Sequence, residues 1–366
     1  MRIVLTGGGT AGHVFPALSV ATALREECGR LGLPLDLLYL GLRTGPEARI
    51  APQHGVPFAA VSARPLRGRN PIAMLRALFS IAWGTLRARS LLRGSAGVLA
   101  TGGYVTVPVA LAARSRRTPL VVYLPDVEPG WAVRLTSRLA RRIATTTDRG
   151  LAHLPRGKAE ATGYPVRPEF RKDSRDVARS MLGIEDGERV LLVAGATQGA
   201  RSLNEAVAAR LEDYLRLARV IHVCGPAHEE AFKAQRDRLP IELRGRYTVD
   251  GFRDDMPRLM IAADLAVLRA GASVLGELPA ARLPAILVPG PFAGAHQAHN
   301  ARYLADAGAA AMLDDDELVR LFGLVESLLT DDERRAAMRV RLAQLDRPNA
   351  ARDIACIVLQ EAGEEP

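Results

Sequence analysis

The sequence predicts an α/β protein made of two Rossmann-like halves, each built on a parallel sheet. Short apolar segments alternate along the chain with segments of helical periodicity, the pattern of a parallel sheet covered by helices. A glycine-rich turn follows the first expected strand of each half, at residues 7–12 and 195–199. The length of 366 residues also suits two domains of ordinary size.

The first half opens on an apolar strand at residues 2–5, which runs directly into the glycine turn. The remaining elements expected in this half are a helix at 16–27 and strands at 35–40, 97–100 and 120–123.

A break near residues 163–168 separates the halves. It holds two prolines and a glycine and is followed by a charged stretch, which is typical of a linker. After it we expect a strand at 189–194, a helix from about 200, strands at 220–224, 265–268 and 285–288, and helices from about 331 onward.

The composition excludes several classes of protein. Cys28, Cys224 and Cys356 lie far apart and form no CxxC pair, so neither a disulfide framework nor a zinc site is expected. The chain begins with a strand pattern and not with a signal peptide, and no uncharged apolar run reaches the roughly 18 residues that span a bilayer. We therefore expect a soluble protein of the reducing cytoplasm that can rest on a membrane.

The charge distribution indicates an anionic partner. The formal net charge is +9, and residues 48–125 contain eleven arginines and no acidic residue. A long stretch of one sign attracts a membrane surface, phosphates or nucleic acid. Since no nucleic-acid-binding motif is present, nucleic acid is not expected.

The first glycine loop, residues 7–12, matches the phosphate-binding pattern G-x-G-x-x-G. Glycines allow backbone N–H groups to approach a phosphate, and the helix N-terminus adds positive potential. A dinucleotide enzyme is one interpretation, but Arg43 follows the second strand where an acidic residue is expected, which suits only NADP. A tight turn without a ligand is another. His13, at the start of the helix, is a candidate for acid–base chemistry or a structural histidine.

Further turns of the same kind lie at 101–105, 195–199 and 269–277, the last leading into a helix near Ser273. Several such loops in one chain predict a nucleoside-diphosphate ligand between the two halves. The Glu277 carboxylate, one turn into that helix, suits ribose hydroxyls or serves only the helix dipole. His296 and His299 lack a nearby third ligand, so they predict polar contacts with a sugar and no metal site.

These motifs together resemble the MurG-type glycosyltransferases, which add N-acetylglucosamine to the lipid-linked muramoyl-pentapeptide precursor of peptidoglycan. The resemblance covers nearly the whole chain, and the motifs keep their order. The matching segments are TGGGTAGHVFPA at 6–17, GGYV at 102–105, TGYPVR at 162–167, TQGARSLN at 197–204, and FRDDM at 252–256 continuing through Glu277 to Gln297 and Asn300.

The resemblance implies a GT-B fold, in which two Rossmann-like domains with parallel sheets face each other across a deep cleft. The first domain would comprise residues 1–163 and the second residues 164–344. A C-terminal helix at about 345–362 would pack back on the first domain.

The resemblance also implies that the second domain binds the donor, UDP-N-acetylglucosamine, without a metal or other cofactor. Arg167 and Thr197 would contact phosphate or nucleotide, Arg253 uracil through its backbone, and Gln297 the sugar hydroxyls. The diphosphate and ribose would be held by Ala272, Ser273, Val274, Leu275, Gly276 and Glu277.

The implied acceptor is undecaprenyl-pyrophosphoryl-muramoyl-pentapeptide, which would lie against Thr10, Ala11, Gly12 and His13. The family's usual His-Glu-Gln-Asn stretch is here Tyr-Leu-Pro-Asp at 123–126, with Asp126 at the asparagine position. Other departures are Thr197 for serine, Ala11 for glycine and His296 for glutamine. Three alternatives therefore stay open: a related transferase with a different lipid or metabolite acceptor, a UDP-N-acetylglucosamine 2-epimerase, and a non-catalytic binder of sugar nucleotides.

The expected reaction is a single displacement that inverts the anomeric carbon. Helix N-termini and Arg167 would stabilise the departing UDP. The acceptor hydroxyl needs a base, for which we expect His13, with Asp126 and Glu128 as rivals.

A helix expected at 71–92 carries an apolar face of Leu75, Phe79, Ala82, Trp83 and Leu86. The arginines around it are residues 64, 67, 69, 76, 87, 89 and 93. Such a face either packs into a core or lies on an anionic membrane surface. The resemblance favours membrane docking, and hence a peripheral protein on the cytoplasmic face of the cell membrane.

Overall fold

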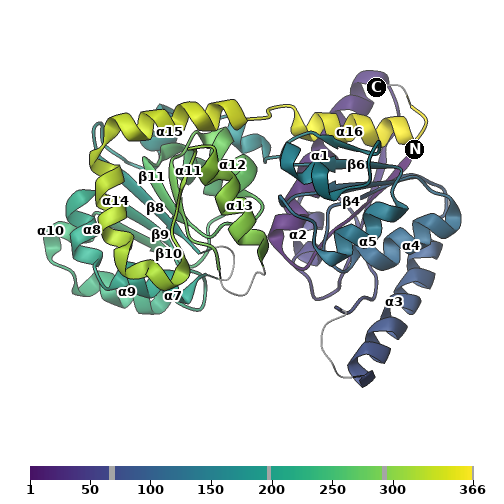
Figure 1. Cartoon of the computed structure of the whole chain (residues 1–366), viewed down its shortest axis with the longest axis horizontal. Helices are drawn as coiled ribbons and strands as arrows, with labels where there is room; N and C mark the ends of the chain where they lie inside the picture. Colours follow the sequence, from purple (N-terminus) through teal and green to yellow (C-terminus); the bar gives the residue numbers. More distant parts are fainter. Residues whose placement is uncertain (66–70, 196–198, 291–294, 365–366) are drawn as a thin grey trace. The chain divides into compact units, whose positions relative to one another are not determined.

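The computed structural model describes residues 1–65, 71–195, 199–290 and 295–364. The chain divides into two compact units (Figure 1): a first unit of Met1–Arg167 with Arg347–Pro366, and a second unit of Pro168–Asp346. The division falls after Arg167 and not after residue 163. Arg167 is therefore part of the first unit, whereas it was expected in the donor-binding domain.

The first unit is built on a sheet with the strand order β3-β2-β1-β4-β5-β6-β7, in which every neighbouring pair is parallel. The central strands are apolar on both faces because helices cover both faces, and all five residues of β5 (LVVYL) are buried. The strands are β1 (Arg2–Thr6), β2 (Asp36–Gly41), β3 (Phe58–Ala60), β4 (Ser95–Ala100), β5 (Leu120–Leu124), β6 (Arg142–Thr145) and β7 (Ala159–Ala161).

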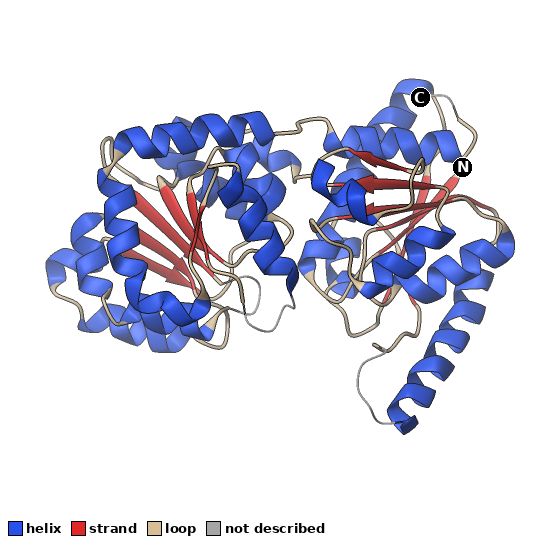
Figure 2. Ribbon diagram, in the orientation of Figure 1, coloured by secondary structure: helices blue, strands red, loops and turns tan. Residues whose placement is uncertain are grey.

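The helices of this unit are α1 (Ala11–Leu31), α2 (Glu47–Gln53), α3 (Pro71–Leu91), α4 (Thr106–Arg116), α5 (Trp131–Leu139), the 3₁₀ helix η1 (Asp148–His153) and α16 (Ala350–Glu361). Figure 2 shows helices on both faces of the sheet. On one face α1 packs against α16, which also contacts β4, β5 and β6. On the other, α4 contacts both α3 and α5.

The last helix is anchored to the first unit by buried apolar side chains and by ion pairs. Ile354 and Leu359 are fully buried. Arg352 Nε lies 2.7 Å from Glu27 Oε1 on α1, and Arg141 contacts Glu361 at 3.5 Å. These contacts join the end of the chain to its beginning.

The second unit repeats the architecture with the strand order β10-β9-β8-β11-β12-β13, again parallel throughout. Its strands are β8 (Val190–Ala194), β9 (Arg219–Val223), β10 (Tyr247–Asp250), β11 (Leu265–Leu268), β12 (Ala285–Leu287) and β13 (Ala311–Met312). Its helices are η2 (Pro168–Arg171), α6 (Arg175–Met181), α7 (Arg201–Ala208), α8 (Leu211–Leu217), α9 (Glu229–Arg238), α10 (Ile241–Arg244), α11 (Met256–Ala262), α12 (Val274–Ala281), α13 (Ala295–Asp306), η3 (Asp315–Arg320), α14 (Leu321–Thr330) and α15 (Asp332–Leu345).

Helix α3 presents its apolar face to solvent. It packs against α4, with the small side chains of Ala77 and Ala88 buried. Gly84 allows an approach so close that an added Cβ would lie 1.9 Å from the Ser62 carbonyl oxygen. The exposed fractions are 69% for Leu75, 72% for Phe79, 59% for Trp83 and 63% for Leu86. The interpretation of this face as core is therefore wrong.

Among the helices in the described part of the chain, none combines the length and the apolar character needed to cross a bilayer.

Candidate functional site

The strand order of the first unit places a ligand site at the carboxyl ends of β1 and β4. The order reverses there, because β2 and β3 lie on one side of β1 and β4 to β7 lie on the other. In parallel α/β sheets, ligands bind beyond the strand ends at such a switch point. The first glycine loop (residues 7–12) follows β1, and the second glycine loop (residues 101–105) follows β4.

The two glycine loops contact each other through their backbones. Gly8 N–H donates to the Gly102 carbonyl oxygen at 3.2 Å. A Cβ on Gly7 would lie 2.1 Å from Thr101 Oγ1, and a Cβ on Gly103 would lie 2.2 Å from the Gly8 carbonyl oxygen. Gly103 also has φ +82°, in the left-handed region that favours glycine. Only glycine therefore allows these two loops to meet.

The first turn of α1 is suited to an anion. Thr10 is the N-cap residue, but its side chain makes no capping hydrogen bond, and the first turn contains no acidic residue. The N–H groups of a helix N-terminus carry partial positive charge and bind phosphate when nothing else satisfies them. Thr10 is exposed and Gly12 half-buried, so the turn is accessible. Ala11 is the first residue of α1.

His13 is held in one orientation by the second glycine loop. Its Nδ1 lies 3.0 Å from the Thr101 carbonyl oxygen, and the Thr101 hydroxyl donates to the His13 carbonyl oxygen at 2.6 Å. A carbonyl oxygen can only accept, so Nδ1 carries the proton. In the neutral ring Nε2 then bears the lone pair, which is the form that a general base requires.

The rivals of His13 lie at the same edge of the sheet. Asp126 and Glu128 follow β5, which pairs with β4, and both side chains are half-buried. Glu128 Oε1 lies 3.9 Å from His153 Nε2 on η1. The Tyr123 hydroxyl is buried against Thr146 Oγ1 at 2.6 Å.

Glu47 is a residue at this site that the sequence analysis did not identify. It is fully buried, and its Oε1 accepts a hydrogen bond from Leu42 N–H at 2.8 Å. A Cβ on Gly8 would lie 2.3 Å from this carboxylate, so Glu47 packs directly beneath the first glycine loop. Burial raises the pKa of Tyr39, and the negative charge of Glu47 raises it further. The Tyr39 hydroxyl donates to the Gly7 carbonyl oxygen. Only the fold brings Glu47 to the loop, so spacing alone could not reveal it.

The second unit has its switch point between β8 and β11. The loop after β11 leads through Gly271 to Ser273, the N-cap of α12, whose side chain makes no capping hydrogen bond. Ala272 and Ser273 are half-buried in this turn, whereas Val274 and Leu275 are buried and Gly276 has no side chain. The N–H groups of Val274, Leu275 and Gly276 already donate within this turn at 3.1 Å. The donors that the segment can offer a ligand are therefore the Ser273 hydroxyl and the backbone N–H groups before Val274. Glu277 lies in the first turn of α12 and is half-buried.

Arg269 braces the loop before α12. Its guanidinium contacts Asp315 Oδ1 at 2.6 Å, Ser202 Oγ at 2.7 Å and the carbonyl oxygens of Val288 and Pro289 at 3.2 Å. The side chain is 8% exposed. These bonds occupy the guanidinium, so its role is structural.

The remaining expected donor residues have side chains with defined partners. Gln297 Oε1 accepts from Gly290 N–H at 2.8 Å, and Asn300 donates to the Ala270 carbonyl oxygen at 3.1 Å. The Arg253 guanidinium pairs with Asp255 at 2.6 Å and Asp250 at 3.0 Å. The hydrogen bond from Arg253 lowers the pKa of Asp255. Because the guanidinium is engaged in these pairs, the part of Arg253 suited to a ligand is its backbone.

Thr197 and Arg167 differ from the other expected donor residues. Thr197 lies outside the described residues. The Arg167 guanidinium lies 4.9 Å from the centre of the Phe15 ring on α1, within the first unit.

The two Rossmann-like units, each with a glycine-rich turn at its switch point, form a GT-B glycosyltransferase fold. Residues 3–145 match the model of the glycosyltransferase family 28 N-terminal domain, and residues 190–354 match that of its C-terminal domain. The chain belongs to this family and, within it, to the MurG-type transferases.

The relatives span almost the full length of the chain. Proteins of Roseiflexus sp. (strain RS-1) and Symbiobacterium thermophilum, each named UDP-N-acetylglucosamine--N-acetylmuramyl-(pentapeptide) pyrophosphoryl-undecaprenol N-acetylglucosamine transferase, are 38% identical. The alignments cover 98% and 97% of this chain and 94% and 95% of the relatives. A crystal structure of Acinetobacter baumannii MurG has a TM-score of 0.72 at 26% identity, covering 98% of this chain and 99% of that chain.

Proposed function

We propose that this enzyme transfers N-acetylglucosamine from UDP-N-acetylglucosamine to the N-acetylmuramyl-(pentapeptide) pyrophosphoryl-undecaprenol precursor of peptidoglycan. The observation that carries the proposal is full-length similarity, at 38% identity, to proteins named for this reaction. The accessible first turn of α1, which contains no acidic residue, suits the acceptor's diphosphate. The proposal therefore places the enzyme in peptidoglycan synthesis, on which cell shape and cell division depend.

We assign the donor to the second unit. The diphosphate would be bound by the N-terminus of α12, in the segment from Ala272 to Gly276, through the Ser273 hydroxyl and the backbone N–H groups before Val274. Glu277 would accept from the ribose hydroxyls, and Gln297 would contact the sugar. The Arg253 backbone and Thr197 complete the proposed set.

The proposed acceptor site is the first turn of α1, with Thr10, Ala11, Gly12 and His13. Nε2 of His13 takes the proton from the acceptor hydroxyl while its oxygen attacks the anomeric carbon. The bond from that carbon to the UDP oxygen breaks in the same step, which inverts the configuration. The leaving diphosphate is stabilised by helix N-terminal N–H groups. The His13–Thr101 contact supports His13 over Asp126 and Glu128 because it directs the Nδ1 proton away from the reacting atoms.

We also propose that the enzyme is peripheral at the cytoplasmic face of the membrane and docks through α3. Leu75, Phe79 and Trp83 would enter the interfacial region. Arg76, Arg87 and Arg89 lie on the same helix and would meet anionic headgroups.

The test is product analysis with UDP-N-acetylglucosamine, alone and with the lipid-linked muramoyl-pentapeptide. We expect release of UDP and formation of the disaccharide lipid only when both substrates are present. Formation of the 2-epimer without acceptor would identify an epimerase. Transfer to another lipid or metabolite alone would keep the class and change the acceptor, whereas failure to release UDP with any acceptor would indicate a binding protein.

A further inference from the structure

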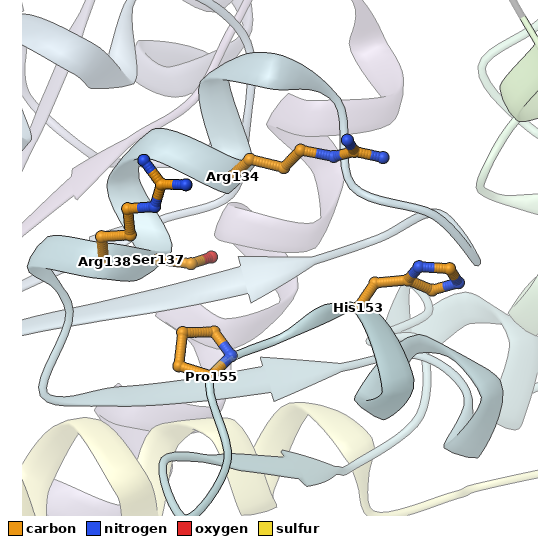
Figure 3. A pocket seen from close by; sticks show the side chains of 5 residues that line it. All are labelled: Arg134, Ser137, Arg138, His153 and Pro155. Atoms are coloured by element: carbon orange, nitrogen blue, oxygen red, sulfur yellow. The ribbon is translucent and has the colours of Figure 1, made fainter.

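A small cavity in the first unit shares no lining residue with the glycine loops. Its volume is about 330 Å³, and its walls are formed by Arg134, Ser137 and Arg138 of α5, by His153 and by Pro155. Figure 3 shows the α5 side chains on one side and those of His153 and Pro155 on the other. This volume is near the lower end of the range for ligand pockets, about 300–1,000 Å³, and suits a small group.

The polar lining of the cavity is cationic or neutral. Arg134 and Arg138 are four residues apart on α5 and therefore share one face of the helix. Arg134 Nε donates to the Pro129 carbonyl oxygen at 2.9 Å, which orients its guanidinium. Among the described residues neither arginine forms an ion pair, and no acidic residue lines the cavity.

Several carboxylates of the same unit are engaged in other ion pairs. Glu160 pairs with Arg142, Glu361 with Arg141 at 3.5 Å, and Asp148 with Arg347 at 3.7 Å. Glu128 lies 3.9 Å from His153 Nε2, at the edge of the lining. The lining itself therefore carries a net positive charge, with the Glu128 carboxylate at its edge.

Ser137 adds an observation that is independent of charge. It is 1% exposed, and its hydroxyl has no hydrogen-bond partner among the described residues, although the side chain lines the cavity. Buried hydroxyl groups nearly always have a partner, because leaving one unsatisfied destabilises the fold. A buried hydroxyl without a partner, in the same lining as two arginines that form no ion pair among the described residues, suits an anionic ligand.

We infer that this cavity is a binding site for a phosphate group, with Arg134 and Arg138 supplying charge and Ser137 donating a hydrogen bond. Guanidinium groups match the oxygen geometry of phosphate and form strong charge-assisted hydrogen bonds with it. Its lining shares no residue with the proposed acceptor and donor sites. A phospholipid headgroup and a soluble phosphate ester present the same chemistry, so the experiment below separates them.

The first test is calorimetric titration of the whole protein with glycerol 3-phosphate. Arg134→Gln/Arg138→Gln is expected to weaken binding about tenfold or more. Arg49→Gln/Arg114→Gln is the matched control: both residues are exposed, lie in the same unit outside the cavity, and remove the same charge. The inference fails if the parent does not bind, or if both double variants weaken binding equally.

Ser137→Ala gives a second test that a general effect of charge or folding cannot reproduce. Without the unsatisfied hydroxyl, the free protein is expected to melt at a higher temperature. Glycerol 3-phosphate is nevertheless expected to bind about threefold more weakly, because one donor is lost. A variant that binds as tightly as the parent overturns the assignment of Ser137.

Vesicles distinguish the two sources of phosphate. If the occupant is a lipid headgroup, the Arg134→Gln/Arg138→Gln variant binds phosphatidylglycerol vesicles more weakly than the matched control does. If the occupant is a soluble ester, the two variants bind vesicles equally while only the first loses glycerol 3-phosphate. Turnover of UDP-N-acetylglucosamine with a water-soluble acceptor should be unchanged in both, so failure here is separable from failure of the proposed reaction.

Discussion

His13 and Thr101 are joined by two hydrogen bonds that run in opposite directions between the start of α1 and the second glycine loop. The His13 Nδ1 donates to the Thr101 carbonyl oxygen at 3.0 Å, and the Thr101 hydroxyl donates to the His13 carbonyl oxygen at 2.6 Å. The pair fixes both the ring orientation and its tautomer, since a carbonyl oxygen cannot donate. Thr101 of the second glycine loop thus leaves the lone pair of the neutral His13 ring on Nε2, the form that the proposed general base requires.

Replacing His13 with alanine should lower kcat about 10²- to 10⁴-fold, the usual contribution of a general base. The KM for UDP-N-acetylglucosamine should change little, because the donor is assigned to the second unit. Steady-state kinetics with both substrates measure this split, and His228→Ala in the second unit serves as the control. Near-normal turnover of His13→Ala together with inactive Asp126→Asn would transfer the role of base to Asp126.

Gly103→Ala should destabilise the protein more than an alanine at another left-handed glycine. Gly94 has φ +72° with no atom within 4 Å of an added Cβ. Gly94→Ala should therefore lower the free energy of unfolding only through the strained backbone conformation, by about 1–2 kcal/mol. Gly103→Ala adds a clash with the Gly8 carbonyl oxygen at 2.2 Å, worth about 1–3 kcal/mol more. Denaturant unfolding of the two variants measures the difference, and equal losses would show that the loops are not in close contact.

The sequence predicted the elements whose signal is local. Strand β1, the glycine turn and the start of α12 depend on adjacent residues, and each lies within a few residues of its expected position. All four edge strands (β3, β7, β10 and β13) and the strand β6 escaped prediction. They have two to four residues each and become strands only by pairing with a longer neighbour.

Contacts between distant segments could not be predicted either. Glu47 reaches the first glycine loop, and Arg167 stacks on Phe15, only because the sheet brings these segments together. Helical periodicity correctly indicated an apolar face on α3 but carries no information about what covers it. The exposure of Trp83 and Phe79 required the structure.

Glu277→Gln should raise the KM for UDP-N-acetylglucosamine about tenfold with little change in kcat, because hydrogen bonds from ribose to a charged acceptor are lost. Glu205→Gln is a suitable control, since Glu205 is 63% exposed on α7 of the same unit and pairs only with Arg201 among the described residues. If Glu277 served only the dipole of α12, the variant would lose stability while its KM stayed that of the parent.

The attachment of α16 should depend on pH through Glu27. Hydrogen bonds from Arg30 and Arg352 hold the pKa of the Glu27 carboxyl below its ordinary value of 4.5, against the effect of burial. The lowered pKa means that its stabilisation is complete above pH 4.5 and is lost as the pH falls through the folded-state pKa. Glu27→Gln should therefore be less stable than the parent at neutral pH, and the gap should close in acid. Thermal melts of Glu27→Gln and of the exposed neighbour variant Glu26→Gln test this, and a gap that persists unchanged in acid would exclude the ion pair as its cause.

Trp83→Glu should abolish binding to anionic vesicles while leaving the fold intact. Trp83 is 59% exposed on the apolar face of α3, so a carboxylate there costs little in water but opposes insertion and is repelled by anionic headgroups. Ile241→Glu is the matched control, because Ile241 is 77% exposed on α10 in the second unit and receives the same change of charge. In flotation with phosphatidylglycerol vesicles, the parent and Ile241→Glu should float and Trp83→Glu should remain at the bottom. A parent that does not float, or two variants that float equally, would remove α3 as the docking surface. Neither Trp83 nor Ile241 contributes to a buried core, so a loss of vesicle binding in either variant cannot be attributed to unfolding.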